Sequence, residues 1–201
     1  MRKFALGASI SNLFSQFRLA PSFSMVRFNL HSVATGILVE LISNEIEIDD
    51  SSGAFIGGLL HDVGKLLIAV SMPKQYEDVL AVAAVSGAPL LVCEREILGT
   101  DHAELSALAI SRWELADSIR WAAFYHHEPE KAVTEHTKSG TLRFSLAVHE
   151  ADALINSLGM SVRSAPRTPR LAAPLEFPGF AFSKERVLKR MELELKGLAL
   201  D

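Results

Sequence analysis

The sequence of 201 residues lacks several features that often assign a protein to a class. It contains a single cysteine, Cys93, so no disulfide can form within the chain, which suits a reducing compartment. Its formal net charge of -4 provides no broad attraction for nucleic acid or for an anionic membrane surface. No apolar run approaches the roughly 20 residues that span a bilayer, and residues 1–7 do not resemble a signal peptide. We therefore expect a cytoplasmic protein that binds neither membranes nor nucleic acid.

Apolar residues show helical periodicity along nearly the whole length of the sequence. Hydrophobic residues make up 49% of the chain, which at this length is sufficient for one domain with a full core. Apolar residues recur with helical spacing, and the helices that we predict span residues 25–44, 51–72, 74–85, 89–98, 101–114, 117–127, 142–158 and 183–196. Four prolines between residues 160 and 179 indicate an extended loop. Without a convincing strand pattern, the predicted fold class is all-α.

Residues that favour helix ends support several of these boundaries. Asp50 or Ser51 can cap the second predicted helix, and Asp101 begins a capping box with the glutamate three residues later. Gly87 and Gly99 follow the third and fourth predicted helices, where glycine is the most favourable residue. The sequence therefore predicts short connections between most of its helices.

The most informative segment is Gly57-Gly58-Leu59-Leu60-His61-Asp62-Val63-Gly64-Lys65, in which a histidine and an aspartate adjoin inside a strongly apolar stretch. A buried charge is costly unless it is paired or bound to a metal. Adjacent helical residues point about 100° apart, so His61 and Asp62 can share one centre only if it lies close to the helix. The neighbouring glycines would permit such an approach. A plain buried ion pair between the two residues is the alternative.

Further candidate ligands lie on other predicted helices, at His31, His102, His126-His127 and Asp152. A metal site requires ligands that converge from several elements, and imidazole suits Fe, Mn, Ni, Zn or Cu. Pro129 disfavours helical geometry at the residue before it, so the preceding helix should end close to the two adjacent histidines. Asp152 lies on an apolar helix face and therefore requires a partner.

Taken singly, most of these residues have ordinary alternatives. His31 alone would be interpreted as a hydrogen-bonded core histidine, and His102, at a helix start, as a solvent-exposed residue. His136 and His149 have no supporting context, and we interpret them as surface or locally hydrogen-bonded residues. The joint order of the histidines and aspartates along the chain is what favours a metal centre.

That order resembles the HD superfamily of metal-dependent phosphohydrolases, and more specifically the HDOD family of bacterial signal-transduction domains. The resemblance rests on residues 57–65, on Glu96-Ile97-Leu98-Gly99-Thr100-Asp101-His102-Ala103-Glu104-Leu105, on Trp113 and on His126-His127-Glu128-Pro129-Glu130. It implies an HD-type helical bundle over residues 5–158, with the proline-rich loop and last helix, residues 159–201, packed on the same domain. HDOD domains usually carry a further helical segment before the position of Ala5, which we expect to be absent here.

Resemblance to the related HD-GYP phosphodiesterases implies two divalent transition metals side by side. One would be held by His31, His61, Asp62 and Asp152, and the other by Asp62, His102, His126 and His127. Arg27 stands four residues before His31, where a trinuclear relative carries a glutamate ligand, so no third metal is expected. Glu128-Pro129-Glu130 replaces the Gly-Tyr-Pro segment, which argues against cyclic di-GMP as the substrate.

Two functions fit these residues. In the first, the protein is a phosphodiesterase-like phosphohydrolase whose two ions, Fe, Mn, Ni or Zn, lower the pKa of a water molecule and hold the phosphoryl group. Asp62 and Lys65 would then be the catalytic residues, because Lys65 shares the helix face of Asp62 and could neutralise a substrate phosphate. In the second, a non-catalytic signal-transduction module retains a structural or sensory metal. The expected partner is a phosphate-containing small molecule or nucleotide, or a signalling protein.

Overall fold

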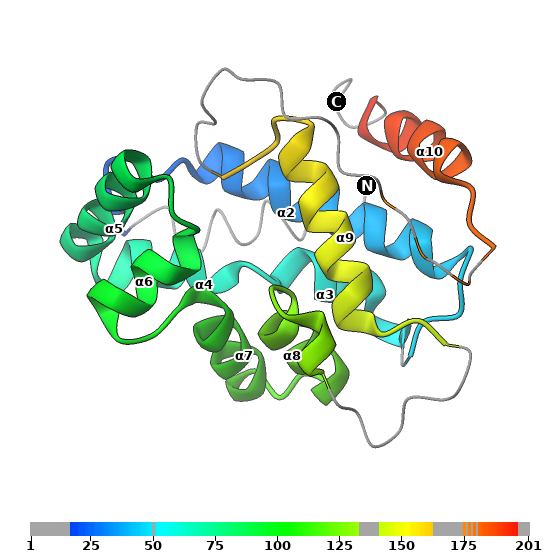
Figure 1. Ribbon diagram of the computed structural model, residues 1–201, viewed down its shortest axis with the longest axis horizontal. Coiled ribbons are helices and arrows are strands. Elements are labelled where there is room, and N and C mark those ends of the chain that lie inside the picture. Colours follow the sequence, from blue (N-terminus) through cyan, green and yellow to red (C-terminus); the bar gives the residue numbers. More distant parts are fainter. Residues whose placement is uncertain are drawn as a thin grey trace.

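The computed structural model describes residues 17–49, 51–132, 141–162, 175, 177, 179 and 181–196 of the chain. These residues form the helices α2 (Met25–Ser43), α3 (Ala54–Leu60), α4 (Val63–Ser71), α5 (Pro73–Ser86), α6 (Leu90–Leu98), α7 (His102–Arg112), α8 (Asp117–Tyr125), α9 (Phe144–Ser157) and α10 (Lys184–Lys196), with 3-10 turns at Ser51–Gly53 and Pro129–Lys131 (Figure 1). Apart from one parallel bridge between Ile48 and Leu142, this part of the chain contains no β-structure. The predicted all-α fold class is confirmed.

Several helix ends follow the predicted capping residues. The side chain of Asp101 accepts a hydrogen bond from a backbone N–H in the first turn of α7, and Gly87 and Gly99 adopt left-handed conformations at the ends of α5 and α6. The predicted cap of the second helix is wrong, because a 3-10 turn precedes that helix and Gly53 takes the N-cap position of α3. Asp50 lies outside the described residues.

The single helix predicted over residues 51–72 is also wrong, because the chain breaks at the histidine–aspartate pair. α3 ends at Leu60, α4 begins at Val63, and His61 and Asp62 form the turn between them. An unbroken helix would point these two side chains about 100° apart. The turn removes that constraint, so both side chains can face one centre.

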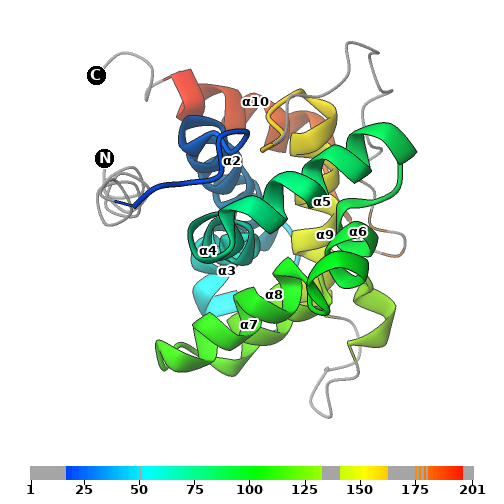
Figure 2. The same cartoon turned by 90° about the vertical axis from the view of Figure 1, so that its left-hand side faces the viewer.

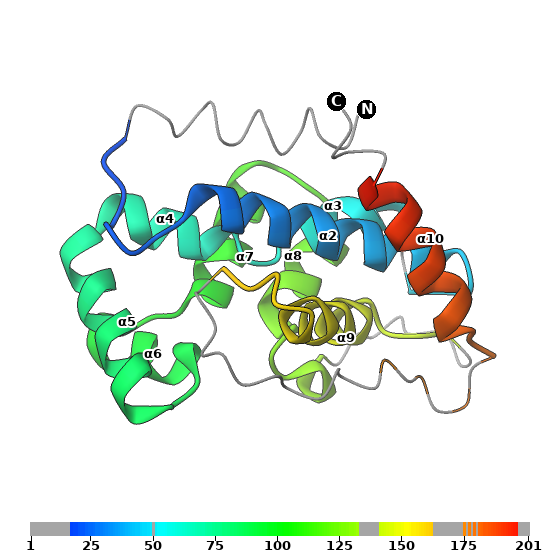
Figure 3. The same ribbon diagram turned by 90° about the horizontal axis from the view of Figure 1, so that it is seen from above.

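The two halves of the broken helix lie in the middle of the bundle. Figure 2 views α3 and α4 nearly end-on, with α2 above them and α7 and α8 below. Viewed from above, α3 and α4 follow one another along the length of α2, with α5 and α6 at one end of the molecule and α10 at the other (Figure 3). α2 packs on α3 and α9, while α7 packs on α4 and α8. The turn at His61-Asp62 is thereby enclosed by helices from distant parts of the sequence.

Glycines allow the helix backbones around this turn to approach closely. A Cβ atom on Gly58 would lie 2.7 Å from the Cα of Gly36, so α3 and α2 touch through their main chains. A Cβ atom on Gly64 would lie 2.0 Å from the carbonyl oxygen of His102, which places the starts of α4 and α7 in direct contact. Side chains at these positions would push apart the helices that carry the candidate ligands.

The buried apolar side chains form two cores, one on each side of the turn. The larger core joins α2, α3, α8, α9 and α10. The smaller core joins α4, α5 and α6 with the first turn of α2. Val187 and Met191 of α10 belong to the larger core, so the last helix packs against α2. The extents of the two predicted units, residues 5–158 and 159–201, remain predictions.

In the part of the chain that the structure describes, two helical stretches are long and apolar enough to cross a membrane by length and composition alone. They are Met25–Ser43 and Ala54–Ser71, of which 67% and 72% are buried inside the protein. The expectation that no apolar stretch approaches membrane-spanning length therefore needs correction. Burial within the bundle accounts for their apolar character, and the second stretch is interrupted by the turn at His61-Asp62.

Gly58→Ala tests the close crossing of α2 and α3. Alanine is favoured over glycine in a helix by about 0.5–1 kcal/mol, but the new Cβ would meet main-chain atoms that cannot rotate away. We expect the free energy of unfolding to fall by about 1–3 kcal/mol, measured by urea titration with far-UV circular dichroism. Ala84→Gly, at an exposed position of α5, measures the propensity effect alone, about 1 kcal/mol. A Gly58→Ala protein as stable as the wild type would contradict the crossing.

Candidate metal centre

Four of the predicted ligands meet at the turn between α3 and α4. His31 from α2, His61 and Asp62 from the turn, and Asp152 from α9 each offer one ligand atom, and these atoms all lie within 4.8 Å of one another. The Nε2 atom of His31 is 3.0 Å from Asp152 Oδ1 and 3.4 Å from Asp62 Oδ2. The Nε2 atom of His61 is 3.4 Å from both carboxylates. His31 and His61 are thus the partners that the carboxylate of Asp152 requires in its apolar setting.

The other three predicted ligands form a second group beside the first. His102 at the start of α7, with His126 and His127 just after α8, also place their ligand atoms within 4.8 Å of one another. The Nε2 atoms of His102 and His127 are 2.7 Å apart. His102 is 1% exposed, so the solvent-exposed alternative for this residue is wrong. α8 ends directly before the histidine pair, as predicted, and the chain turns there.

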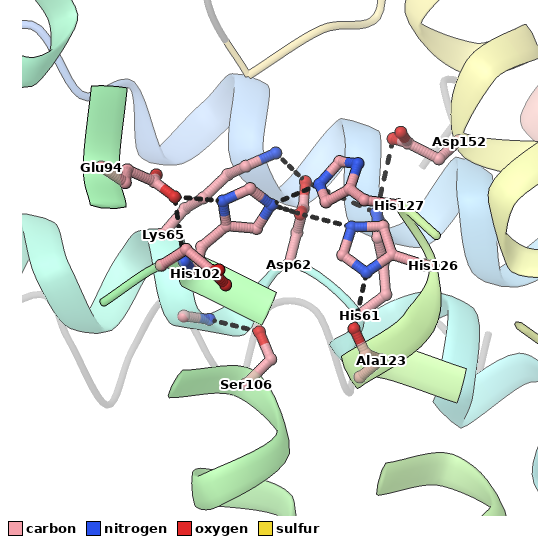
Figure 4. A network of polar contacts seen from close by, with 12 residues as sticks. His61, Asp62, Lys65, Glu94, His102, Ser106, Ala123, His126, His127 and Asp152 are labelled. Carbon is pink, nitrogen blue, oxygen red and sulfur yellow. Dashed lines mark hydrogen bonds and ion pairs between the residues drawn. The ribbon is translucent and has the colours of Figure 1, made fainter. Parts of the chain in front are cut away.

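Asp62 lies between the two groups, as the close-up of the site shows (Figure 4). Its Oδ2 atom faces His31 and His61, both at 3.4 Å. Its Oδ1 atom faces His102 at 3.4 Å and His126 at 3.7 Å. Its side chain is fully buried. The two oxygens of one carboxylate therefore point to different ligand groups.

Main-chain carbonyls fix the orientation of three of the buried histidine rings. The Nδ1 atoms of His31, His61 and His126 lie 2.9, 2.8 and 2.6 Å from the carbonyl oxygens of Met160, Gly58 and Ala123. Because a carbonyl oxygen only accepts hydrogen bonds, each Nδ1 carries the proton and donates. Nε2 is then the nitrogen that faces the centre in each ring, and its lone pair is available to a metal when the ring is neutral.

Three residues outside the predicted site form hydrogen bonds to its ligands or to the main chain beside them. The Oε2 atom of Glu94 accepts hydrogen bonds from the backbone N–H and the Nδ1 of His102. The Nδ1 of His149 donates to the carbonyl oxygen of His126, 23 positions earlier in the chain, so the interpretation of this histidine as a surface or locally hydrogen-bonded residue needs correction. Ser106 Oγ accepts from the backbone N–H at the start of α4. The sequence contains no specific signal for Glu94, which is followed directly by two further charged residues, Arg95 and Glu96. His136 lies outside the described residues.

Arg27 holds the turn that follows α9. Its Nε atom donates to the carbonyl oxygen of Ser161 at 2.9 Å, and its Nη2 atom to that of Gly159 at 3.2 Å. Met160, which lies between them, orients His31 through its carbonyl oxygen. The residue that stands where a trinuclear relative carries a ligand thus contacts the main chain beside the site.

Burial and neighbouring charges shift the ionisation of the acidic groups strongly. Burial disfavours the charged form of Asp62, yet the charges of His61 and Lys65 hold the pKa of its carboxyl well below its ordinary value. Burial likewise opposes ionisation of Asp152, but its hydrogen bonds with His31 and His61 keep its pKa well below the ordinary value. Both aspartates are therefore carboxylates at neutral pH.

The pKa values of the basic groups shift in opposite directions. Burial lowers the pKa of His31, but hydrogen bonds to the two aspartates outweigh burial and raise this pKa to about 9. Burial and the neighbouring His102 lower the pKa of His127 to about 3, and burial with the neighbouring His127 lowers the pKa of His126. Burial also opposes ionisation of Lys65, but the charge of Asp62 raises the pKa of its amine. Lys65 Nζ lies 2.5 Å from Asp62 Oδ2.

The donor set fits a metal. Asp62 Oδ1 and His126 Nε2 are buried and have no hydrogen-bond partner among the residues that the structure describes. Buried acceptors without a donor are costly, and a cation placed between them would satisfy both atoms. Among the described residues there are thus two largely buried groups that could hold a metal, one of histidines and aspartates and one of histidines alone. Imidazole nitrogens with a few carboxylate oxygens suit transition metals.

The fold is shared with several solved structures. An HDOD domain protein of unknown function from Geobacter sulfurreducens matches 98% of this chain and 67% of its own, with a TM-score of 0.76 and 19% identity. A protein from Shewanella amazonensis SB2B, provisionally described as a phosphohydrolase, matches 78% of this chain and 54% of its own, with a TM-score of 0.61 and 19% identity. A provisionally described signal transduction protein from Marinobacter aquaeolei VT8 matches 96% of this chain and 41% of its own, with a TM-score of 0.66 and 17% identity.

At these identities the likeness shows the fold alone, and the chain spans about half or less of the last two proteins. No curated protein matches the sequence. The family model of the HDOD domain, however, matches residues 1–129, which is more than half of the chain. The expected resemblance is confirmed, and the chain belongs to the HDOD domain family.

Proposed function

We propose that this HDOD domain binds two divalent transition metals and hydrolyses a phosphodiester or a related phosphate compound in bacterial signalling. The first ion would be held by His31, His61, Asp62 and Asp152. The second would be held by His102, His126, His127 and the same Asp62. Fe, Mn, Ni and Zn are the metals that suit such ligands.

The observation that carries this proposal is the placement of Asp62. Its Oδ2 faces one group of ligand atoms and its Oδ1 faces the other. A carboxylate that served only as the partner of one histidine would not need histidines on both oxygens. A plain buried ion pair between His61 and Asp62 leaves Oδ1 of Asp62 and Nε2 of His126 unsatisfied. Two ions that share Asp62 would satisfy both atoms.

The side chains of this protein would orient the metal ligands and supply positive charge for the hydrolysis. When bound, the two ions would lower the pKa of a water molecule and stabilise negative charge on the phosphoryl group. The hydrogen-bonded rings hold their Nε2 lone pairs in fixed directions. Lys65 and Asp152 are 12% and 14% exposed, while the side chain of Asp62 is fully buried. Lys65 therefore lies at the more open side of the site, where its ammonium group can neutralise a substrate phosphate.

A second candidate function is a signalling module that retains the metals without catalysis. His31, His61, Asp62, His102 and His126 are all at most 1% exposed, so access to the ligand atoms is narrow. In this function the metals stabilise the bundle or report a cellular condition, and a signalling protein is the partner. Both functions require metal binding, and turnover distinguishes them.

Asp62→Ala should abolish metal binding. Protein purified without chelator is expected to contain about two transition-metal ions per chain by elemental mass spectrometry. Removal of the shared carboxylate should weaken binding by more than about 100-fold, since the loss of even an outer partner of a ligand costs about 10–100-fold. Hydrolysis of bis-(p-nitrophenyl) phosphate should be lost with the metals.

Asp78→Ala is the matched control for this experiment, because Asp78 is exposed on α5. This protein should keep both ions and the wild-type activity. Circular dichroism must show that both variants are folded. An Asp62→Ala protein that retains two ions would contradict the shared-ligand arrangement.

Lys65→Ala should separate binding from turnover. Its expected metal content equals that of the wild type, because Lys65 provides no ligand atom. Its rate of phosphodiester hydrolysis should fall by about 100-fold, the typical cost of losing one charge-stabilising group. Lys74→Ala, at an exposed position of α5, should leave both quantities unchanged. If the metal-loaded wild type hydrolyses no phosphomonoester or phosphodiester, the non-catalytic function replaces the phosphohydrolase.

A further inference from the structure

Glu94 is a buried carboxylate to which the proposed function assigns no role. It lies on α6 and is 0% exposed. Its Oε2 atom accepts hydrogen bonds from the backbone N–H of His102 at 2.9 Å and from the Nδ1 of His102 at 2.5 Å (Figure 4). Its Oε1 atom has no hydrogen-bond partner in the described part of the chain. Both hydrogen bonds of Glu94 are thus made to His102, which is a candidate metal ligand.

The negative charge at this position needs an explanation. Burial of a carboxylate costs several kcal/mol unless the surroundings compensate for it. A neutral glutamine of the same shape could accept the same two hydrogen bonds at a smaller desolvation cost. The ammonium group of Lys65 already contacts Asp62. What the charge of Glu94 acts on most directly is the ring of His102.

The four buried histidine rings differ in what their Nδ1 atoms contact. Those of His31, His61 and His126 donate to neutral carbonyl oxygens, whereas that of His102 donates to a carboxylate. A hydrogen bond to an ionised acceptor is stronger and raises the basicity of the opposite ring nitrogen. For His102 that nitrogen is Nε2, which lies 3.4 Å from Asp62 Oδ1 and 2.7 Å from the Nε2 of His127. The carboxylate therefore strengthens a donor in one ligand group only.

We propose that Glu94 is a positioning residue that sets the metal affinity of the group formed by His102, His126 and His127. This inference rests on the metal binding proposed above. The four-residue group has two carboxylates, Asp62 and Asp152, among its own ligand atoms. The three-histidine group shares the carboxylate of Asp62 with the other group. Glu94 adds a further negative charge, which acts on the three-histidine group through its hydrogen bond to the ring of His102. The charge of Glu94 thus sets how tightly the centre holds its second ion.

Titration of metal-free protein with Co²⁺ tests this role, with visible absorption and competition against a chelator as readouts. Wild-type protein should bind two ions per chain. Glu94→Gln should bind the first ion with wild-type affinity and the second about 10–100-fold more weakly. Asp152→Asn should instead weaken the ion of the four-residue group. Glu96→Gln, at an exposed position of the same helix, should match the wild type.

Two results would overturn the role of Glu94 while the proposed function survives: both ions bind Glu94→Gln as tightly as they bind the wild type, or both weaken equally. If the glutamine variant does not fold, Glu94→Asp keeps the charge and takes its place. It should bind the second ion within about tenfold of the wild type, and selective loss of the first ion would contradict the inference. A wild type that binds no Co²⁺ overturns the metal function and this inference together.

Discussion

The burial of the Asp62 carboxylate is the constraint around which the centre of this protein is built. A fully buried charge costs several kcal/mol unless its surroundings compensate for it, and side chains from α2, α4, α7 and the turn itself supply the compensation. Asp62 occupies the N-cap position of α4, where an aspartate ordinarily bonds to the helix. Among the described residues its side chain makes no such capping bond. The carboxylate is turned toward His31 and His61 on one side and toward His102 on the other.

The partners of Asp62 come close together because the helices that carry them touch through their backbones. Gly36 and Gly58 let α2 touch α3, and Gly64 lets α4 touch the start of α7. Each of these contacts lies within a few residues of a ligand. Because the two cores lie on either side of the turn between α3 and α4, a substitution that separates either helix pair would move ligands beside Asp62. Packing and site geometry therefore depend on the same glycines.

Much of this arrangement could be predicted from the sequence, because helical periodicity and capping residues are local signals. The helix that begins after Asp101 and the one that ends directly before His126 are examples. The break at His61 could not be predicted, since the residues around it are all compatible with a continuous helix, and the tertiary contacts of Gly64 and Asp62 determine the turn. The hydrogen bonds of Glu94 could not be predicted for a similar reason. Its partner His102 lies on the next helix, and spacing along the chain does not reveal a hydrogen bond between helices.

In the proposed function, the contact between Lys65 and Asp62 affects both the charge around Asp62 and the positive charge that an incoming phosphate meets. The amine of Lys65 bonds to Oδ2, the same oxygen that faces His31 and His61. A metal cation at the same oxygen would repel the ammonium group and weaken its contact with Asp62. Lys65 would therefore be held less firmly by Asp62 when the first position is filled. Its side chain is 12% exposed, so the ammonium group would be available to an incoming phosphate at the moment when the centre is ready to act on it.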